Sequence, residues 1–239
     1  MIHFVILTLF ENMFTEFKNS TVIKRAIDTK KVEIETLNIR DFSTDKHKRV
    51  DFPPYGGGSG MIISCEPLSY AIDFARDKLS KISNKEIEII YLSPRGKTLN
   101  QSISSSFVNS DKNYILICGH YEGIDERIIE EYNVCEISIG DYVLTGGELA
   151  TQVLLDSVIR LIPGVISEGS LDEESHKNGL LEYPQYTKPY EFRGRKVPDV
   201  LISGHHENIN KYRKQESIRI TKKYRPELLK NYNKENNNI

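Results

Sequence analysis

The fold of this chain is decided by one stretch, VCEISIGDYVLTGGELATQVLLDSVIRLIPG, which occupies residues 134–164. Its first residues are mostly apolar and end at Gly140, which predicts a short strand. Thr145-Gly146-Gly147-Glu148 has the Ser/Thr-x-x-Glu form of a capping box, so we expect a helix to begin there. One face of that helix is formed by Ala150, Val153, Leu154, Ser157, Val158 and Leu161. Pro163-Gly164 is expected to end it.

The residues before this stretch repeat the same alternation of strand and helix. We predict strands at residues 2–9, 32–39, 86–92 and 114–118, and helices at residues 13–28, 67–79 and 124–132. The strand at 86–92 is expected to stop at Ser93-Pro94-Arg95-Gly96, and residues 53–60 to form a loop. Alternating strands and helices predict an α/β fold with a parallel sheet.

The C-terminal part has a different composition. Residues 166–180 are polar and acidic without a clear period, which indicates a flexible linker. We therefore predict a first domain at residues 1–165 and a small, mostly helical domain at residues 181–239. Helices are expected at residues 207–224 and 226–232.

The charge is unevenly distributed along the chain. The whole protein has a formal charge of −2, but residues 176–239 contain 14 Lys and Arg against 7 Asp and Glu. Such a basic segment favours a polyanionic partner such as a nucleic acid, with an ordinary solvated helical face as the alternative.

Composition also disfavours several classes of protein. No apolar stretch is long enough to span a membrane, and the N-terminus lacks the features of a secretion signal. Three widely spaced cysteines are typical of a reducing cytoplasm, and Cys118 and Cys135 are expected to be buried and inert. The glycine-rich residues 55–60 lack the lysine of a P-loop, which disfavours a nucleotide hydrolase.

Glycines follow three of the predicted strands. Gly119, Gly140 and the Ser93–Gly96 turn each come at the carboxyl end of a strand, the edge at which α/β sheets bind ligands. Together these three loops could enclose one small ligand, although each could also be an ordinary turn. Residues 55–60 are similarly open to two interpretations, a flexible turn or a backbone that approaches a substrate closely.

Two long motifs, GHYEGIDER at residues 119–127 and SIGDYVLTGGEL at residues 138–149, resemble the tRNA (guanine-N1)-methyltransferase family. The segments at residues 55–61, 91–96, 160–165, 179–181, 184–187 and 225–229 are similar to it in the same order. The resemblance implies a SPOUT fold with a deep trefoil knot and a cytoplasmic homodimer whose active sites are shared between chains. It also implies S-adenosylmethionine as methyl donor and tRNA with guanine at position 37 as substrate.

The resemblance further implies which residues form the sites. The methyl donor is expected to contact Tyr91, Leu92, Ser93, Pro94, Gly119, Tyr121, Glu122, Gly123, Ile139, Gly140, Asp141, Tyr142, Val143, Leu144, Gly146 and Gly147. The tRNA is expected to contact Gly57, Gly58, Ser59, Glu182, His206, Arg213 and Lys214. His120 stands where some members have arginine, and we do not expect it to be catalytic. Mg²⁺ is expected to support activity, but no dedicated carboxylate cage is visible.

The reaction requires a base and a cation. Guanine N1 loses a proton as it accepts the methyl group, and negative charge develops on O6. By resemblance Arg160 stabilises that charge, although it could instead be a cation at a helix C-terminus. Glu174 stands where the family has an aspartate and is the expected base, with Asp172 as the alternative. A simple solvated acidic run at residues 172–174 is the remaining interpretation.

Two other functions remain open at this point. A retained fold could bind RNA without methylating it, which would leave strongly salt-dependent binding and no transfer. A related SPOUT enzyme could modify another position of tRNA or rRNA.

Overall fold

The computed structural model describes residues 1–167, 174–176 and 179–236. The chain divides into two compact units, Met1–Ile166 and Ser167–Ile239. Within the described residues, no helix combines the length and the apolar character needed to cross a lipid bilayer.

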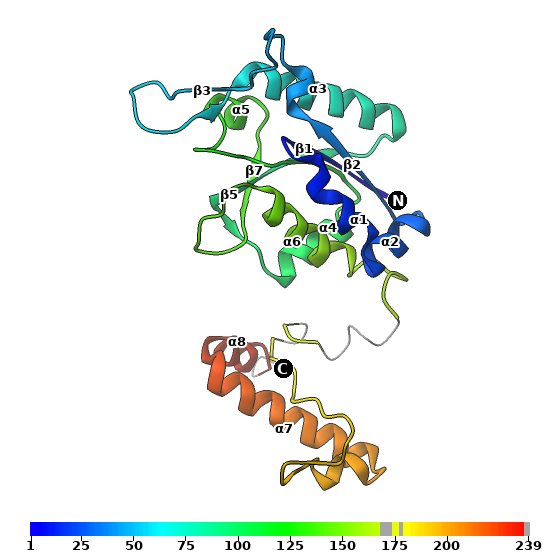
Figure 1. The fold of residues 1–239 in the computed structure, drawn as a ribbon. Helices are drawn as coiled ribbons and strands as arrows, with labels where there is room; N and C mark the ends of the chain where they lie inside the picture. The colour runs from blue at the N-terminus through cyan, green and yellow to red at the C-terminus, as the bar shows by residue number, and fades with distance from the viewer. Residues whose placement is uncertain (168–173, 177–178, 237–239) are drawn as a thin grey trace. The chain divides into compact units, whose positions relative to one another are not determined.

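A five-stranded parallel sheet forms the centre of the first unit (Figure 1). Its strands lie in the order β2-β1-β6-β5-β7. Their bounds are β1 Ile2–Thr8, β2 Val32–Asn38, β5 Ile87–Thr98, β6 Asn113–Ile117 and β7 Cys135–Ser138. Every pairing in this sheet is parallel, so the prediction of an α/β fold with a parallel sheet is confirmed.

Helices cover both faces of the sheet (Figure 1). One face packs against α2 (Thr21–Asp28), α4 (Gln101–Asn109) and α6 (Glu148–Ile159), and the other against α3 (Cys65–Ile82) and α5 (Glu126–Glu131). Along β1 the side chains alternate: Phe4 and Ile6 belong to the first core, Val5 and Leu7 to the second. Burial on both faces explains why the strand is continuously apolar.

The helix predicted at residues 13–28 is divided into three pieces. These are the 3₁₀ turn η1 (Glu11–Phe14), α1 (Thr15–Asn19) and α2. Ser20 separates the last two because its backbone is extended, with φ −64° and ψ 146°. The sequence did not predict α4, and it did not predict the two-residue strands β3 (Asp51–Phe52) and β4 (Ile62–Ile63) that bracket the loop at 53–60.

The prediction that the strand at 86–92 stops before Ser93 was wrong. β5 continues to Thr98, and both Leu92 and Lys97 pair with Ile137 of β7. The residues between them bulge away from the ladder. Gly96 permits the close return, because a Cβ there would lie 2.4 Å from the backbone N of Ile137.

The capping box predicted for α6 does not form. Gly147 is the N-cap, no side chain caps the helix, and Glu148 is its first residue. Glu148 is instead 2% exposed, and its Oε1 accepts a hydrogen bond of 2.8 Å from Thr8 Oγ1. A partner distant in sequence has therefore replaced the local one.

Cys118 is fully buried, as predicted, and burial raises the pKa of its thiol well above the usual range. Cys135, predicted to be buried, is exposed. It begins an edge strand of the sheet, so its position has no neighbouring strand on one side.

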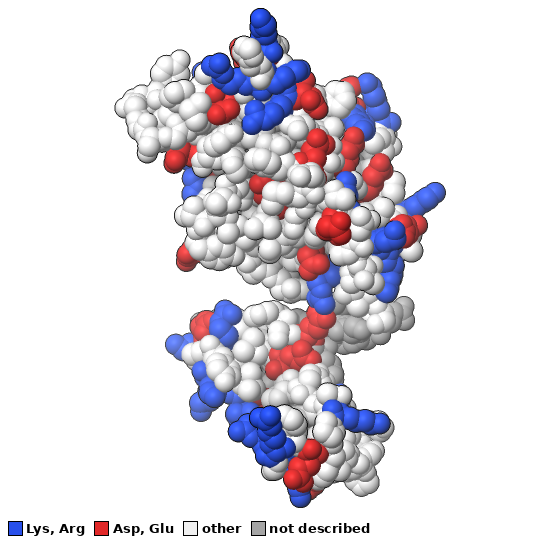
Figure 2. Space-filling model, viewed as in Figure 1, with Lys and Arg blue, Asp and Glu red and all other residues white. Residues whose placement is uncertain are grey.

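The second unit is mainly helical. It contains the hairpin β8 (Glu191–Phe192) and β9 (Arg195–Lys196), the turn η3 (Asp199–Ile202), and the helices α7 (His206–Tyr224) and α8 (Pro226–Asn236). Both predicted C-terminal helices are confirmed. The backbone N–H of Leu181 donates to the buried Thr221 Oγ1 at 2.8 Å, which ties the start of the unit to α7. Lys and Arg side chains gather along this unit (Figure 2).

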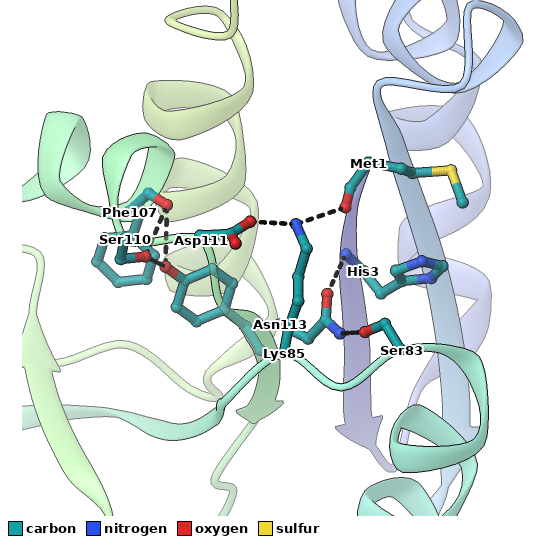
Figure 3. Close-up of polar contacts among 9 residues, drawn as sticks. Met1, His3, Ser83, Lys85, Phe107, Ser110, Asp111 and Asn113 are labelled. Atoms are coloured by element: carbon teal, nitrogen blue, oxygen red, sulfur yellow. Dashed lines mark hydrogen bonds and ion pairs between the residues drawn. The ribbon is translucent and has the colours of Figure 1, made fainter.

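Polar contacts join the strands at their amino ends (Figure 3). The buried Asn113 side chain accepts from the His3 backbone N–H at 3.1 Å and donates to Ser83 Oγ at 2.8 Å. Lys85 Nζ lies 2.6 Å from Asp111 Oδ1 and donates to the Met1 carbonyl at 3.3 Å. This edge is thus closed by hydrogen bonds, whereas the opposite edge carries the glycine loops.

Candidate functional site

A cavity of about 220 Å³ lies at the carboxyl ends of β5, β6 and β7. The loops after β6 and β7 and the bulge of β5 line it. All residues predicted to contact the methyl donor line this cavity except the exposed Asp141. The lining also includes residues that the sequence argument missed, namely His120, Ile137, Ser138, Thr145 and Ala150. All five lie within or directly beside the recognised motifs.

The two long loops are held against each other by backbone contacts. The N–H of Gly147 donates to the carbonyl of Gly119 at 2.8 Å, and His120 and Gly146 form an antiparallel bridge. A Cβ at Gly147 would lie 2.8 Å from Cys118 Cα and 2.9 Å from Gly119 N. Both atoms belong to the backbone and cannot move aside easily, so this close approach requires glycine.

Tyr91 forms one wall of the cavity. It is 7% exposed, and its ring packs so closely on Gly119 that a Cβ there would lie 2.7 Å from Tyr91 Oη. Burial, together with the Glu136 carboxylate, raises the pKa of Tyr91. The phenol therefore stays neutral at physiological pH and presents a hydroxyl group.

The loop after β7 is shaped by Ser138. Its hydroxyl accepts a hydrogen bond from the Gly140 N–H at 3.2 Å and donates one to the Gly140 carbonyl at 3.1 Å. Gly140 has φ +146°, a conformation that side chains disfavour. Beyond it Tyr142 and Val143 are 53% and 83% exposed, so apolar groups remain available at the mouth of the cavity.

A second hollow of about 680 Å³ adjoins the first. The two share five lining residues, namely Tyr91, Ser93, Pro94, Glu122 and Gly123. Its cations already have partners, because Arg95 pairs with Glu126 and Glu136 and Arg127 pairs with Asp125. The hollow is consequently poorly suited to a phosphate group.

The loop at residues 53–60 borders the second hollow through Pro54 and Tyr55. The predicted substrate residues Gly57, Gly58 and Ser59 lie in its exposed part. The loop forms a projection without charged side chains in Figure 2. Gly57 and Gly58 have positive φ values of 82° and 121°, and a Cβ at Gly57 would meet nothing within 4 Å.

Arg160 lies at the opposite end of α6 from the cavity. Gly147 is the N-cap and Arg160 the C-cap of that helix, and at a rise of about 1.5 Å per residue they lie about 20 Å apart. Just beyond Arg160, the Val165 carbonyl accepts from Arg25 of α2 at 3.1 Å. This distance exceeds the span of an arginine side chain, so Arg160 does not reach the cavity of its own chain.

Glu174 belongs to the second unit and is half-buried. The neighbouring Ser175 Oγ accepts from the Glu182 N–H at 3.0 Å, and Glu182 Oε1 accepts from Gln185 Nε2 at 2.6 Å. Asp172, the alternative base, lies outside the described residues.

The remaining predicted tRNA contacts lie on α7. His206 and Lys214 are exposed, whereas the guanidinium of Arg213 lies over the Tyr183 ring at 4.8 Å. Among the described residues, no group of three or more His, Cys, Asp and Glu side chains is arranged to hold a metal ion.

Comparisons with known proteins agree with these motifs. The family model described as tRNA (Guanine-1)-methyltransferase TrmD matches residues 2–231. The tRNA (guanine-N(1)-)-methyltransferase of Malacoplasma penetrans is 54% identical over 231 residues, which are 97% of this chain and 98% of the relative. The enzymes of the same name from Ruminiclostridium cellulolyticum and Clostridium beijerinckii are each 53% identical, covering 95% and 94% of this chain and 95% and 91% of theirs.

Proposed function

Because the chain belongs to the tRNA (guanine-1)-methyltransferase family, we propose that it methylates N1 of the guanine at position 37 of tRNA in the cytoplasm. The observation that carries the proposal is the cavity at the carboxyl ends of β5, β6 and β7, whose lining coincides with the family motifs.

The residues of the cavity suit S-adenosylmethionine. Backbone N–H and C=O groups of the loops at 119–123 and 139–147 can read the edge of an adenine, and Ile139, Val143 and Leu144 offer apolar surface. The neutral Tyr91 hydroxyl and the Glu122 carboxylate add polar groups. When bound, the donor supplies a methyl group on a positively charged sulfur. We propose that these loops form the deep trefoil knot of SPOUT enzymes, supported by the backbone contacts between them.

We assign proton removal from guanine N1 to Glu174. A glutamate carboxylate accepts a proton about as readily as the aspartate that the family has at this position. Arg160 stabilises the charge that develops on O6. The target base must also leave its stack to reach such a cavity.

The position of Arg160 supports a homodimer with shared active sites. Along α6 the arginine lies about 15 Å from Ala150, which also lines its own cavity, so in this mechanism it acts on the base held at the partner's cavity. The second unit binds tRNA through its basic side chains, of which Lys214 and His206 are exposed on α7. Mg²⁺ supports the reaction without a dedicated protein site.

The test is transfer of labelled methyl groups from S-adenosylmethionine to an unmodified tRNA with guanine at position 37. The same tRNA with adenine there is the control substrate. Glu174→Gln removes the proposed base, and Glu191→Gln, on an exposed hairpin strand, is the matched control variant. We expect transfer to guanine only, lost in Glu174→Gln and retained in Glu191→Gln.

Other outcomes would contradict particular parts of the proposal. Transfer that survives Glu174→Gln would move the base to another residue. Salt-dependent tRNA binding without transfer by the wild type would favour a non-catalytic RNA-binding protein. Transfer to a different nucleotide would favour a related SPOUT enzyme.

A further inference from the structure

A small polar cluster lies directly beneath the cavity and has no role in the proposed chemistry. Its members are Thr8 at the end of β1, Glu148 at the start of α6 and His120 in the loop after β6. Thr8 is fully buried and Glu148 is 2% exposed. His120 lines the cavity itself.

The hydroxyl of Thr8 has both of its hydrogen-bonding roles assigned. Its oxygen accepts from the Phe10 N–H at 2.9 Å, and its proton goes to Glu148 Oε1 at 2.8 Å. The carboxylate is thus fixed through one oxygen, and the N-terminus of α6 favours its negative charge. A buried carboxylate is strongly stabilised by each further donor that reaches it.

The imidazole of His120 supplies a candidate donor. Its Nδ1 is buried and has no hydrogen-bond partner within the described structure. A Cβ on Gly146 would lie 2.7 Å from this Nδ1 and 2.5 Å from Glu148 Oε2. Nδ1 and Oε2 therefore face the same small space, which stays open because residue 146 is glycine.

The ring of His120 is held between two aromatic side chains. Phe10 lies 5.0 Å away with an interplanar angle of 57°, and Tyr121 lies 4.7 Å away nearly perpendicular. The Phe10 N–H donates to the Thr8 hydroxyl, so the residue that holds Glu148 also holds one of the two aromatic residues beside the His120 ring.

We propose that His120 is a positioning residue for the methyl donor, acting with Glu148. In the filled cavity Nδ1–H donates to Glu148 Oε2 across Gly146. The proton is thereby held on Nδ1, and Nε2 keeps a lone pair that accepts from an N–H or O–H of the donor molecule. This assignment rests on the proposed function, because it takes S-adenosylmethionine as the ligand of the cavity.

Nuclear magnetic resonance of the ring nitrogens tests the assignment directly. The protein contains six histidines, and the His120 signals are identified by their absence from His120→Phe. The probe is S-adenosylhomocysteine, the product left by methyl transfer, added to the full-length protein. We expect the Nδ1 proton of His120 to become protected from exchange when the probe binds, and this change to be lost in Glu148→Gln.

Calorimetry with the same probe gives an independent readout. His120→Phe should weaken binding about tenfold, the effect of one lost hydrogen bond. Gly146→Ala places a methyl group between Nδ1 and Oε2 and should weaken binding similarly. The double variant should be no weaker than either single variant, because both remove one interaction. His47→Phe, at an exposed histidine outside the cavity lining, is the matched control and should bind normally.

The possible failures are distinguishable. If the wild type binds the probe while the His120 signals do not move, the assignment is wrong and the proposed function stands. Equal affinities of wild type and His120→Phe would refute the assignment in the same way. If the wild type does not bind the probe, the proposed function fails and the assignment fails with it.

Discussion

The proposed mechanism makes one sharp prediction, which is that Arg160 acts at the partner's cavity. The two ends of α6 lie about 20 Å apart, which supports the proposal that Gly147 and Arg160 of one chain act in different active sites. Two variants inactivate these ends separately. Arg160→Ala removes the cation, which in comparable enzymes costs about 100- to 1000-fold in rate.

Gly147→Ala disrupts the cavity by a calculable amount. Its Cβ would lie 2.8 Å from Cys118 Cα, and overpacking of this kind costs about 1–3 kcal/mol. The hydrogen bond from Gly147 to Gly119 would be strained at the same time, adding about 1 kcal/mol. The upper limit of the effect on donor binding, reached when the whole of this total of about 2–4 kcal/mol opposes the bound arrangement, is about 30- to 700-fold. Each variant homodimer should therefore be nearly inactive at a donor concentration below the wild-type Kd.

The assay uses heterodimers made by co-expressing two differently tagged chains and purifying through both tags. A heterodimer of Arg160→Ala with Gly147→Ala should recover about half of the wild-type activity, since one of its two shared sites is intact. The control pairs a wild-type chain with one that carries both changes. It should be inactive, because each shared site then contains one defect.

The opposite pattern would refute the reasoning. If each site were built within one chain, the first heterodimer would be inactive and the control would keep about half of the activity. Failure of the two tags to purify together would contradict the dimer itself.

Three further predictions follow. The Arg127 guanidinium holds the pKa of Asp125 well below its usual range. The ionised carboxylate therefore stabilises the folded protein at pH values above the pKa that Asp125 has in the unfolded chain. This stabilisation is lost as the pH falls through the pKa of Asp125 in the folded protein. Asp125→Asn keeps an N-cap side chain on α5 but loses the ion pair with Arg127, so it should lower the free energy of unfolding by up to about 1 kcal/mol at neutral pH. Urea titrations should show a smaller difference below about pH 4. Asn113→Ala removes two hydrogen bonds and leaves the His3 N–H without its acceptor, so urea titration should give a loss of about 2 kcal/mol, and a loss near zero would show that the amino edge is not stabilised by this side chain. Excess chelator should reduce methyl transfer and added Mg²⁺ should restore it, whereas unchanged transfer would exclude a required metal.

The features that the sequence predicted best were those specified by local patterns. The strand and helix of residues 134–164 have apolar periods of different length, and their boundaries were predicted within a few residues. The loops at Gly119 and Gly140 were predicted to meet because carboxyl ends of parallel strands share an edge. Both loops do line the cavity, and binding of the methyl donor there remains a prediction.

The features that were missed depend on contacts between distant residues. Ser93-Pro94-Arg95-Gly96 has the composition of a strand-ending turn, yet the chain bulges and pairs again, since Gly96 can approach Ile137. Glu148 has the spacing of a capping residue, but Thr8, which is 140 residues away, provides its partner. Local propensity cannot rank such alternatives, because the competing partner is known only once the sheet has formed.

The two proposed catalytic residues, Arg160 and Glu174, both lie outside the cavity lining. The loops and the side chains that line the cavity all belong to one chain, so the cavity forms without a partner. A cation and a base must instead approach the guanine after the base has entered, and neither Arg160 nor Glu174 belongs to the cavity lining. Arg160 lies at the far end of α6, and Glu174 lies in the second unit. In the proposed mechanism, a single chain would therefore bind the donor without completing the site, and assembly with a partner and with tRNA would supply the groups that remove the proton and stabilise the charge.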